Sequence, residues 1–282
     1  MASRELTLVM DGLGFGEGLR WRDDRLWFSD FLEHRVSSIG LDGDLRVEAE
    51  LDDRPSGIGW LPDGRLLVVS MHRRTVLRRE PDGALVTHAD LAPVATSHAN
   101  DMVVAADGTA YVGNFGSDVF GGSSRATAQL AIVRPDGTVL GGPTDLEFPN
   151  GTVITPDGRT LIVGESFARR YRAFPIAADG TLGAGRVWAD VTERAPDGCT
   201  LDAEEAIWFA NALGREVVRV REGGEVEEVI STPDGSYACA LGGTDGRKLF
   251  VATAGTLPTS DAPLSTGRLW AVDVDVPHGG WP

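Results

Sequence analysis

The chain has 282 residues, 42% of them apolar, and a formal net charge of −16. The apolar fraction is that of a folded protein with a sizeable core and excludes disorder. The acidic charge argues against nucleic acid or an anionic membrane surface as the partner. No run approaches the roughly 20 apolar residues of a membrane span, and the first residues lack the apolar stretch of a signal peptide. Because two cysteines are too few for a disulfide framework, we expect a cytoplasmic protein.

One turn-and-strand phrase recurs along the chain. In chain order its six copies are WRDDRLWFSD from Trp21, LPDGRLLVV from Leu61, AADGTAYVG from Ala105, TPDGRTLIV from Thr155, LDAEEAIWFA from Leu201 and GTDGRKLFVA from Gly243. An Asp-Gly pair suits a tight hairpin because Gly accepts positive φ and Asp hydrogen-bonds to the backbone of its own turn. Each copy therefore predicts a hairpin, and the copies from Trp21 and Leu201 are the weaker ones.

A second Asp-Gly turn lies between successive copies. It reads LDGDL from Leu41, EPDGAL from Glu80, RPDGTV from Arg134 and AADGTL from Ala177. Two hairpins in each unit of roughly 40–50 residues make four strands, which is the pattern of a propeller blade. Six such units occupy residues 1–282, so the sequence predicts a single all-β domain, a six-bladed β-propeller with four antiparallel strands per blade. The alternative, a β-sandwich with irregular hairpins, does not explain six copies of one phrase.

The strand before each turn phrase begins on the opposite face of the molecule, where the six first strands meet at the axis. Seven residues before the turn aspartate, or before its replacement, the six copies carry Glu17, Ser56, Asn100, Asn150, Asp197 and Ala238. Two carboxylates and two amides among them form an oxygen-rich set that suits one divalent cation. We expect Ca²⁺, with Mg²⁺, Mn²⁺ and Zn²⁺ as alternatives. The competing interpretation is that these side chains cap strand ends through water.

At these residues the chain resembles the SMP-30/gluconolactonase/luciferin-regenerating enzyme family, calcium-type six-bladed propeller hydrolases. The phrases that carry the resemblance are GEGLRW at 16–21, HAND at 98–101, FPNGTVITPDGRTLIV at 148–163 and APDGCTLDAEEAIWFA at 195–210. The resemblance implies that Glu17, Asn150 and Asp197 are metal ligands and that Asn100 lies at the metal or on the substrate. It also implies hydrolysis of a lactone.

Two positions bear on the substrate. Sugar-lactone members of the family typically place Arg two residues before the Asn that Asn100 matches, and here that residue is His98. Asp118 falls where such enzymes carry another acidic contact. The loss of the Arg argues against an aldonolactone and leaves metal-assisted hydrolysis intact, so we expect a lactone or ester more apolar than a sugar.

The expected chemistry is attack of a metal-activated water on the carbonyl carbon, with the cation stabilising the oxyanion. Asp197 is the expected general base, and Asn100 is expected to orient water or substrate. His98 is the alternative base, because its unperturbed pKa is near neutrality. Ser166, in the phrase GESFA, is expected to be a loop residue rather than a nucleophile, because a strand follows it instead of a helix.

The loops between the second and third strands of each blade are expected to rim the site. They cover residues 29–35, 70–74, 114–129, 164–170, 211–215 and 254–268. The third and sixth are long enough to be functional lids. Phe31, Phe115, Phe120 and Phe167 would make the mouth apolar, with packing between blades as their alternative role. The expected substrate contacts are His98, Ser56, Asp118, Phe115 and Phe167.

Two other functions stay open. A phosphotriester hydrolase could use the same four oxygen ligands. A non-catalytic propeller could bind a protein or a small ligand on this face, with the cation purely structural. The expected partner is a small molecule, and the expected assembly is a monomer or a weak homo-oligomer.

Overall fold

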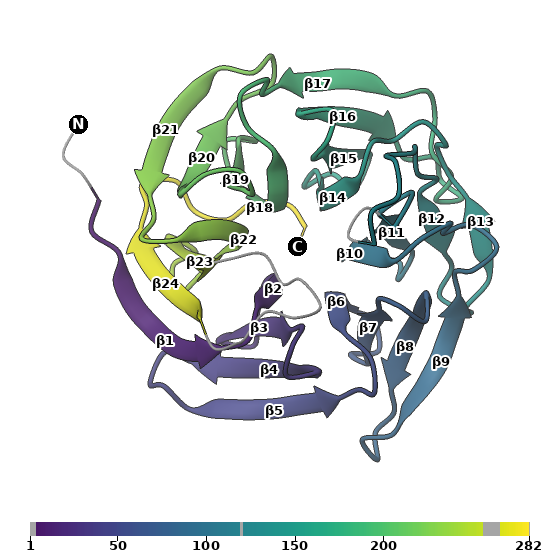
Figure 1. Cartoon of the computed structure of the whole chain (residues 1–282), viewed down its shortest axis with the longest axis horizontal. Coiled ribbons are helices and arrows are strands. Elements are labelled where there is room, and N and C mark those ends of the chain that lie inside the picture. Colours follow the sequence, from purple (N-terminus) through teal and green to yellow (C-terminus); the bar gives the residue numbers. More distant parts are fainter. Residues whose placement is uncertain (1–3, 119–120, 256–265, 282) are drawn as a thin grey trace.

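Each repeated turn phrase forms the hairpin between the two inner strands of a four-stranded sheet. The computed structural model describes residues 4–118, 121–255 and 266–281, and these residues form 24 strands and no helix. The strands make six antiparallel sheets arranged in a ring, so the predicted six-bladed β-propeller is confirmed (Figure 1). No helix that could cross a membrane occurs in this described part of the chain.

In each of the first five blades the strands run from the axis outward in chain order. Blade 1 consists of β2 (Gly16–Arg22), β3 (Arg25–Asp30), β4 (Arg35–Gly40) and β5 (Leu45–Glu50). Blade 2 consists of β6 (Pro55–Trp60), β7 (Leu66–Ser70), β8 (Thr75–Arg79) and β9 (Leu85–Asp90). Blade 3 consists of β10 (Ala99–Val104), β11 (Ala110–Asn114), β12 (Ala131–Val133) and β13 (Val139–Gly141).

Blade 4 consists of β14 (Pro149–Ile154), β15 (Thr160–Glu165), β16 (Arg170–Pro175) and β17 (Arg186–Asp190). Blade 5 consists of β18 (Pro196–Leu201), β19 (Ile207–Asn211), β20 (Glu216–Val220) and β21 (Val226–Ser231). Blade 6 consists of β22 (Gly235–Gly242), β23 (Lys248–Ala254), β24 (Gly267–Asp273) and, as its outer strand, β1 (Thr7–Leu13).

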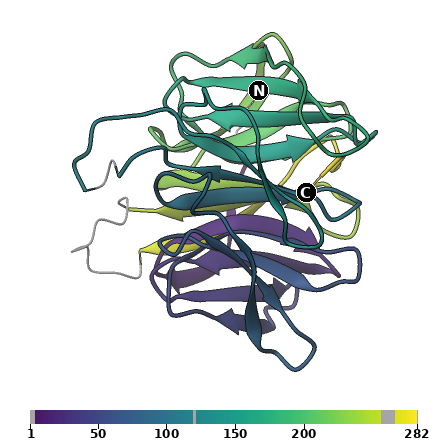
Figure 2. The ribbon, with the colours of Figure 1, turned by 90° about the vertical axis from the view of Figure 1, so that its right-hand side faces the viewer.

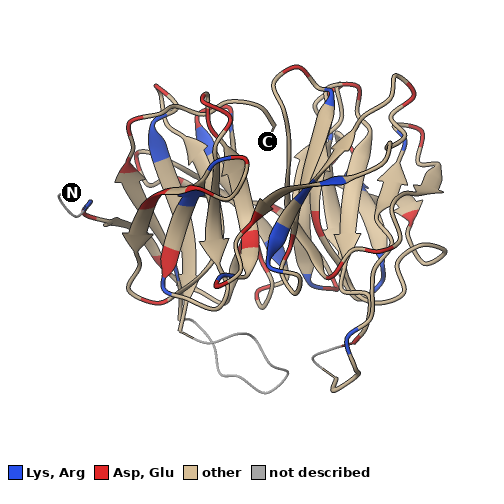
Figure 3. Ribbon diagram, turned by 90° about the horizontal axis from the view of Figure 1, so that it is seen from above, with Lys and Arg blue, Asp and Glu red and all other residues tan. Residues whose placement is uncertain are grey.

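The turns between inner strands have the chemistry that the phrase predicts. In blade 3 the Asp107 carboxylate accepts a hydrogen bond from the Thr109 backbone at 2.8 Å, and Gly108 has φ of +90°. In the weaker first copy, Asp23 and Asp24 themselves adopt positive φ, of 51° and 57°. A two-residue turn in which both residues have positive φ matches the twist of the flanking strands. Acidic residues accordingly recur at the turns of the face that carries the C-terminus (Figure 3).

The ring is closed by the N-terminal strand. β1 pairs antiparallel with β24, so the last blade combines one strand from the start of the chain with three from its end (Figure 1). Arg4, just before β1, bonds to Glu228 of blade 5 and donates to the Asp273 carbonyl at 2.8 Å. The repeated turn phrase could not predict this closure, because β1 follows no Asp-Gly turn.

The C-terminal segment crosses the turn side of the inner strands. Trp281 forms an isolated bridge with Ile154 at the end of β14, and His278 forms one with Asp202 just after β18. The Trp281 backbone donates to the Ile154 carbonyl at 2.9 Å. Figure 1 shows the C-terminus close to the axis. This segment therefore lies at the end of the axis opposite to the starts of the inner strands.

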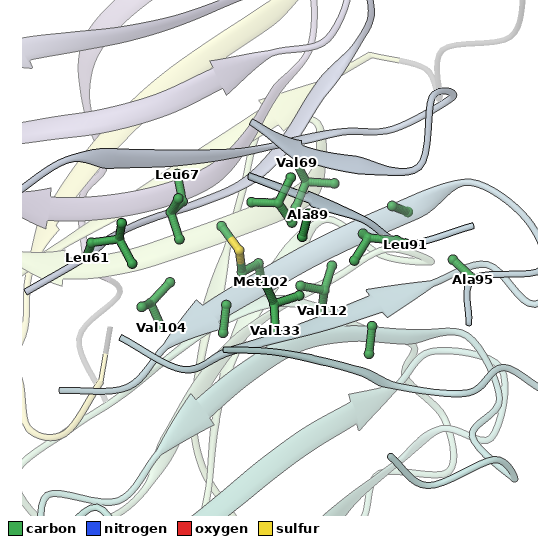
Figure 4. Close-up of a cluster of buried hydrophobic side chains, with 14 residues drawn as sticks. Leu61, Leu67, Val69, Ala89, Leu91, Ala95, Met102, Val104, Val112 and Val133 are labelled. Atoms are coloured by element: carbon green, nitrogen blue, oxygen red, sulfur yellow. The ribbon is translucent and has the colours of Figure 1, made fainter. Parts of the chain in front are cut away.

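The core lies between neighbouring blades. Figure 4 shows one such cluster, in which Leu67 and Val69 of blade 2 meet Met102 and Val112 of blade 3, all four fully buried. Close approach of the inner strands depends on glycine. A Cβ on Gly57 would lie 2.2 Å from the Met102 backbone nitrogen. Packing at the axis thus fixes the inner strands rigidly, which suits a site built on them.

Candidate active site

A cavity of about 410 Å³ opens where the six inner strands begin. Its floor is formed by Glu17, Asn100, Asn150 and Asp197, each the second residue of an inner strand. Its walls come from the loops between the second and third strands and from the crossings that lead into each blade. The prediction that these four residues come together is therefore supported by their common place, and Asn100, Asn150 and Asp197 are each only 6% exposed.

A β-bulge aims each floor side chain. Every inner strand pair has a register shift at its cavity end, for example between Pro149 and Thr152 in blade 4 and between Pro196 and Cys199 in blade 5. A bulge leaves residues unpaired and turns their side chains out of the regular alternation. Here it directs the second residue of the strand toward the axis. Three of the four floor residues are followed by glycine, Asn100 being followed by Asp101. The glycine is needed because the next inner strand lies against it, as at Gly151, where a Cβ would meet the Asp197 carbonyl oxygen at 2.2 Å.

The sixth position of the ring is Tyr237, and the expectation of Ala238 there is wrong. A Cβ on Gly18 would meet the Ser56 carbonyl, and a Cβ on Gly198 would meet the Tyr237 carbonyl, so Ser56 and Tyr237 take equivalent places. The register shift of blade 6 falls between Ser236 and Ala238. The turn between Gly242 and Lys248 is as long as that between Trp60 and Leu66, but β22 has one more residue between its bulge and its turn. Counting seven residues back from Asp245 therefore stops one residue short of Tyr237.

Tyr237 fills the side of the site that an alanine would have left open. It lines the cavity, is 5% exposed, and its ring centroid lies 4.7 Å from that of Phe15. Ala238 instead packs in the core between blades 6 and 1. Burial, followed by the charges of Asp197 and Glu17, raises the pKa of Tyr237 to about 12. The phenol is therefore neutral near pH 7.

Ser56 is placed behind the floor. It is 2% exposed and is not among the described residues that line the cavity. Its hydroxyl donates to the Asn100 Oδ1 at 3.5 Å, and the Asn100 Nδ2 donates to the Pro149 carbonyl at 3.2 Å. These two contacts orient the Asn100 amide. Ser56 is thus a support for Asn100, and the structure gives it no direct access to a ligand in the cavity.

Ser166 supports Asn150 in the same way. The Asn150 Nδ2 donates to the Ser166 hydroxyl at 3.3 Å, and that hydroxyl donates to the Pro196 carbonyl at 2.6 Å. A hydroxyl whose proton is held by a backbone carbonyl is not activated by a base. Ser166 lies in the loop after β15, as the sequence predicts, and positions a floor residue.

The floor concentrates negative charge. Burial, and after it the charge of the nearby Asp101 carboxylate, raises the pKa of Asp197 to about 8. Burial, and after it the charges of Asp197 and Asp101, also raises the pKa of Glu17 well above its usual range. Two carboxyl groups in one dry site cannot both ionise without a neighbouring positive charge. The floor therefore fits a divalent cation.

The donor chemistry of the floor is that of a hard cation. Its four side chains offer carboxylate and amide oxygens, the ligands that Ca²⁺ prefers. Across the described residues no three His, Cys, Asp or Glu side chains cluster as metal ligands. The set therefore lacks the nitrogen and sulfur ligands that dominate zinc sites.

A buried ion pair lies next to the floor. The Arg20 Nη2 donates to the Asp101 Oδ1 at 2.9 Å, and both side chains are at most 5% exposed. The same guanidinium donates to the Leu19 and Met102 carbonyls at 2.7 and 2.6 Å. Asp101 follows Asn100 in the chain, so this pair holds the backbone of a floor residue. The sequence signal that could have revealed it is the opposite charge of Arg20 and Asp101, each in the interior of an inner strand.

Two histidines meet on one wall of the cavity. His98 lines the cavity as predicted, and its ring lies edge-on to that of His72, with centroids 4.6 Å apart. The His72 Nδ1 is 2.6 Å from the Asp53 Oδ1. Asp53 is itself fixed by a hydrogen bond from the Ser70 hydroxyl at 2.6 Å. Burial, followed by the neighbouring His72, lowers the pKa of His98. His72 lies in the loop 70–74 that was expected to rim the site, but its pairing with Asp53 was not predicted.

The remaining wall is aromatic. Phe115 stacks on Phe148 with ring centroids 4.4 Å apart, and Phe148 lies 4.5 Å from Phe167. Phe15 and Phe31 continue this wall on the other side, with centroids 5.4 Å apart. Phe31, Phe115 and Phe167 thus line the cavity, as their sequence positions suggested. Phe120 lies outside the described residues.

The long loop between β11 and β12 extends from the cavity face (Figure 2). It contributes Asp118 to the cavity wall, as predicted. The Asp118 Oδ1 accepts a hydrogen bond from the Gly121 backbone at 2.8 Å. The other long loop falls mostly on residues 256–265, outside the described part of the chain.

A family model described as the SMP-30/gluconolactonase/LRE-like region matches residues 15–255. The chain belongs to this family. The match spans all the floor residues, and it confirms the resemblance drawn from the four sequence phrases.

Relatives and solved structures agree with this membership. The L-arabinolactonase of Azospirillum brasilense is 23% identical over 286 residues, which cover 98% of this chain and 90% of the relative. The calcium-binding protein regucalcin of Agrobacterium tumefaciens superposes with a TM-score of 0.83 at 21% identity, over 100% of this chain and 99% of that one. A gluconolactonase of Xanthomonas campestris superposes with a TM-score of 0.76 at 23% identity, over 97% and 90%.

Proposed function

We propose that this family member is a metal-dependent hydrolase that opens a lactone, or a related carboxylic ester, by attack of water on the carbonyl carbon. The observation that carries the proposal is the floor of the cavity, where two buried carboxylates and two amides converge beneath an aromatic wall. Relatives that are named lactonases support the reaction class. We expect Ca²⁺ as the native ion, and the name of the regucalcin neighbour supports it.

Glu17, Asn150 and Asp197 would hold the cation, and Asn100 would lie beside it. When bound, the cation acts as a Lewis acid on the carbonyl oxygen and acidifies a bound water. Asn100 is fixed by Ser56 and by the Pro149 carbonyl, so its amide is preoriented toward water or substrate. These positions rest on rigid inner strands.

Asp197 is the proposed general base, because it combines a place at the floor with a carboxylate oxygen that can accept the proton of the attacking water. His98 is the second candidate. It lines the same cavity, and burial lowers its pKa, so its imidazole is neutral and able to accept a proton. Variants of the two residues distinguish these roles.

The substrate is proposed to be more apolar than a sugar lactone. Five phenylalanines and Tyr237 line a cavity that is open to solvent on one side. Stacked rings bury apolar carbon well but offer few partners for sugar hydroxyls. With both cysteines free and buried, a reducing compartment is proposed, in keeping with a cytoplasmic monomer or weak homo-oligomer.

The test is hydrolysis of three substrate classes with and without EDTA: alkyl γ-lactones and a sugar lactone, an aryl ester, and a phosphotriester. We expect Ca²⁺-dependent opening of the alkyl lactones, and Asp197→Asn should lower kcat/KM by about a thousandfold. Asp42→Asn, at an exposed turn on the opposite face, is the matched control. If His98→Gln lowers kcat/KM more than Asp197→Asn does, the general base is His98.

The other outcomes identify the competing functions. Turnover of the phosphotriester alone would assign phosphotriester hydrolysis to the same floor. No turnover of any substrate with any divalent metal, together with calcium binding that Asp197→Asn abolishes, would make the propeller a binding module with a structural cation. Turnover that is unchanged in EDTA after removal of bound metal would contradict the proposal.

A further inference from the structure

Three arginines line the cavity on three consecutive blades. Arg54 lies in the crossing that leads into β6, Arg125 in the loop between β11 and β12, and Arg169 in the loop between β15 and β16. All three lie on the wall and mouth rather than on the floor. Since blades 2, 3 and 4 are neighbours, the three guanidinium groups approach the cavity from one side, the side that also carries His98.

None of these three arginines forms an ion pair with a carboxylate of the described residues. Arg125 lies 4.0 Å above the Phe167 ring, and Arg169 donates to the Thr192 carbonyl at 3.0 Å. Their sequence neighbours behave differently. Arg170 pairs with Glu165 at 2.7 Å, and Arg73, on the same face, pairs with Asp52 at 2.5 Å. The charges of Arg170 and Arg73 are thus neutralised by carboxylates, whereas the three arginines that line the cavity have no such partner among the described residues.

This arrangement is unexpected in so acidic a chain. The sequence has 42 acidic and 26 basic residues, so carboxylates outnumber their possible partners. The acid near the mouth, Asp118, uses one carboxylate oxygen to hold the Gly121 backbone. The acids of the floor, Glu17 and Asp197, are the ones that a cation would neutralise. The wall therefore carries three guanidinium groups that have no ion-pair partner among the described residues.

We infer that the substrate carries a carboxylate at the end remote from its lactone carbonyl, and that Arg54, Arg125 and Arg169 bind this carboxylate. The inference rests on the proposed function and adds the substrate class: a lactone joined through an apolar segment to an anionic end. Guanidinium groups bind carboxylates through paired hydrogen bonds. The aromatic wall between the floor and these arginines packs against the connecting carbons.

The test compares a γ-lactone that carries a terminal carboxylate on a short alkyl chain with the primary amide of the same compound. For the wild-type protein loaded with Ca²⁺ we expect kcat/KM to be at least about tenfold higher for the carboxylate. The advantage should shrink as KCl is raised, because salt screens the exposed arginines. Arg54→Gln and Arg125→Gln should each reduce the carboxylate-to-amide ratio, mainly through KM, and lysine at the same positions should restore part of it.

Arg215→Gln is the matched control. Arg215 is an exposed arginine in the corresponding loop of blade 5, where it donates to the Pro233 carbonyl and does not line the cavity. Its variant should keep the wild-type ratio. Equal kcat/KM for the two compounds, or a ratio that the Arg54 and Arg125 variants leave unchanged, would overturn the inference while lactone opening still stands.

A binding measurement separates this inference from the proposed function. If no lactone is opened, calorimetry with hexanoate and hexanamide still tests the arginines. Hexanoate should bind at least about tenfold more tightly than hexanamide, and Arg54→Gln and Arg125→Gln should remove the difference. Equal affinities would overturn the inference, and so would a hexanoate preference that survives both variants, since the anion would then be bound at the floor.

Discussion

At the residue scale, the two acids of the floor determine how the protein responds to pH and to cations. Burial raises the pKa of Asp197 to about 8 in the folded protein, against about 3.9 for an unperturbed aspartate. A carboxyl group with a raised pKa must keep its proton in the folded state after the unfolded chain has lost it. The contribution of Asp197 to folding stability therefore falls as pH rises from about 4 to about 8.

Calcium should reverse this loss. Because the cation takes the place of the proton, we expect the rise in Tm on adding Ca²⁺ to be larger at about pH 8 than at about pH 5. Calorimetric scans in EDTA and in Ca²⁺ at the two pH values measure it. Asp197→Asn, which has no proton to lose, should flatten the pH dependence of the metal-free form. A calcium effect that is equal at both pH values would contradict the coupling.

Single side chains also mark where sequence reasoning reached its limit. Glu17, Asn100, Asn150 and Asp197 could be placed together from a count of seven residues, because in these four blades the bulge lies at that distance from the turn phrase. Tyr237 could not, because β22 has one more residue between its bulge and its turn, which shifts the count. The loop 70–74, which carries His72, was expected at the rim, but the contact of His72 with Asp53 was missed because both residues lie on loops, whose course is decided by the strands that they connect.

At the element scale, the inner strands depend on backbone contact between blades. In four of the six blades the residue after the bulged position is a glycine (Gly18, Gly57, Gly151 and Gly198). This glycine brings the next inner strand close enough to bury cores such as that of Leu67, Met102 and Val112. A side chain at such a position meets backbone atoms, which cannot move aside as a flexible side chain can. The turn repeat signals the hairpins, and these glycines signal the contacts between them.

Gly57→Ala tests this contact. Its Cβ would lie 2.2 Å from the Met102 nitrogen, so the two strands must separate, and we expect a loss of about 3 kcal/mol or more in the free energy of unfolding. Chemical denaturation measures it. Gly183→Ala, where the nearest atoms are 3.5 Å away and φ is not positive, is the control and should change stability by less than about 1 kcal/mol. Equal effects of the two variants would show that the inner strands do not need the close approach.

At the scale of the whole molecule, ring closure joins the two ends of the chain. β1 covers the edge of β24, and Arg4 connects it to Glu228 of the neighbouring blade. An open propeller would expose this edge strand and the faces of the blades beside it. Closure is therefore expected to hold the geometry of the floor, since Glu17 lies in the strand that follows β1.

Deletion of residues 1–13 should abolish cooperative unfolding near the wild-type Tm and promote aggregation. The physical reason is that β24 loses its outer partner and the core between blades 6 and 1 loses Leu13. Thermal scans with light scattering measure both effects. Deletion of residues 1–3 is the control, because it retains Arg4 and all of β1. A shortened chain that lacks 1–13 yet melts cooperatively at the wild-type temperature would show that β1 is dispensable for closure.

The sequence by itself determined the six blades, their four strands and the floor of Glu17, Asn100, Asn150 and Asp197. These features follow from local sequence, because the Asp-Gly turns define the hairpins and the floor residues lie at a fixed distance from those turns. Only the tertiary structure decided that Tyr237 completes the ring, that β1 closes it, that Arg20 pairs with Asp101, and that Arg54, Arg125 and Arg169 share one wall. Each of these depends on segments far apart in the chain, whose meeting is set by packing and register rather than by any local pattern.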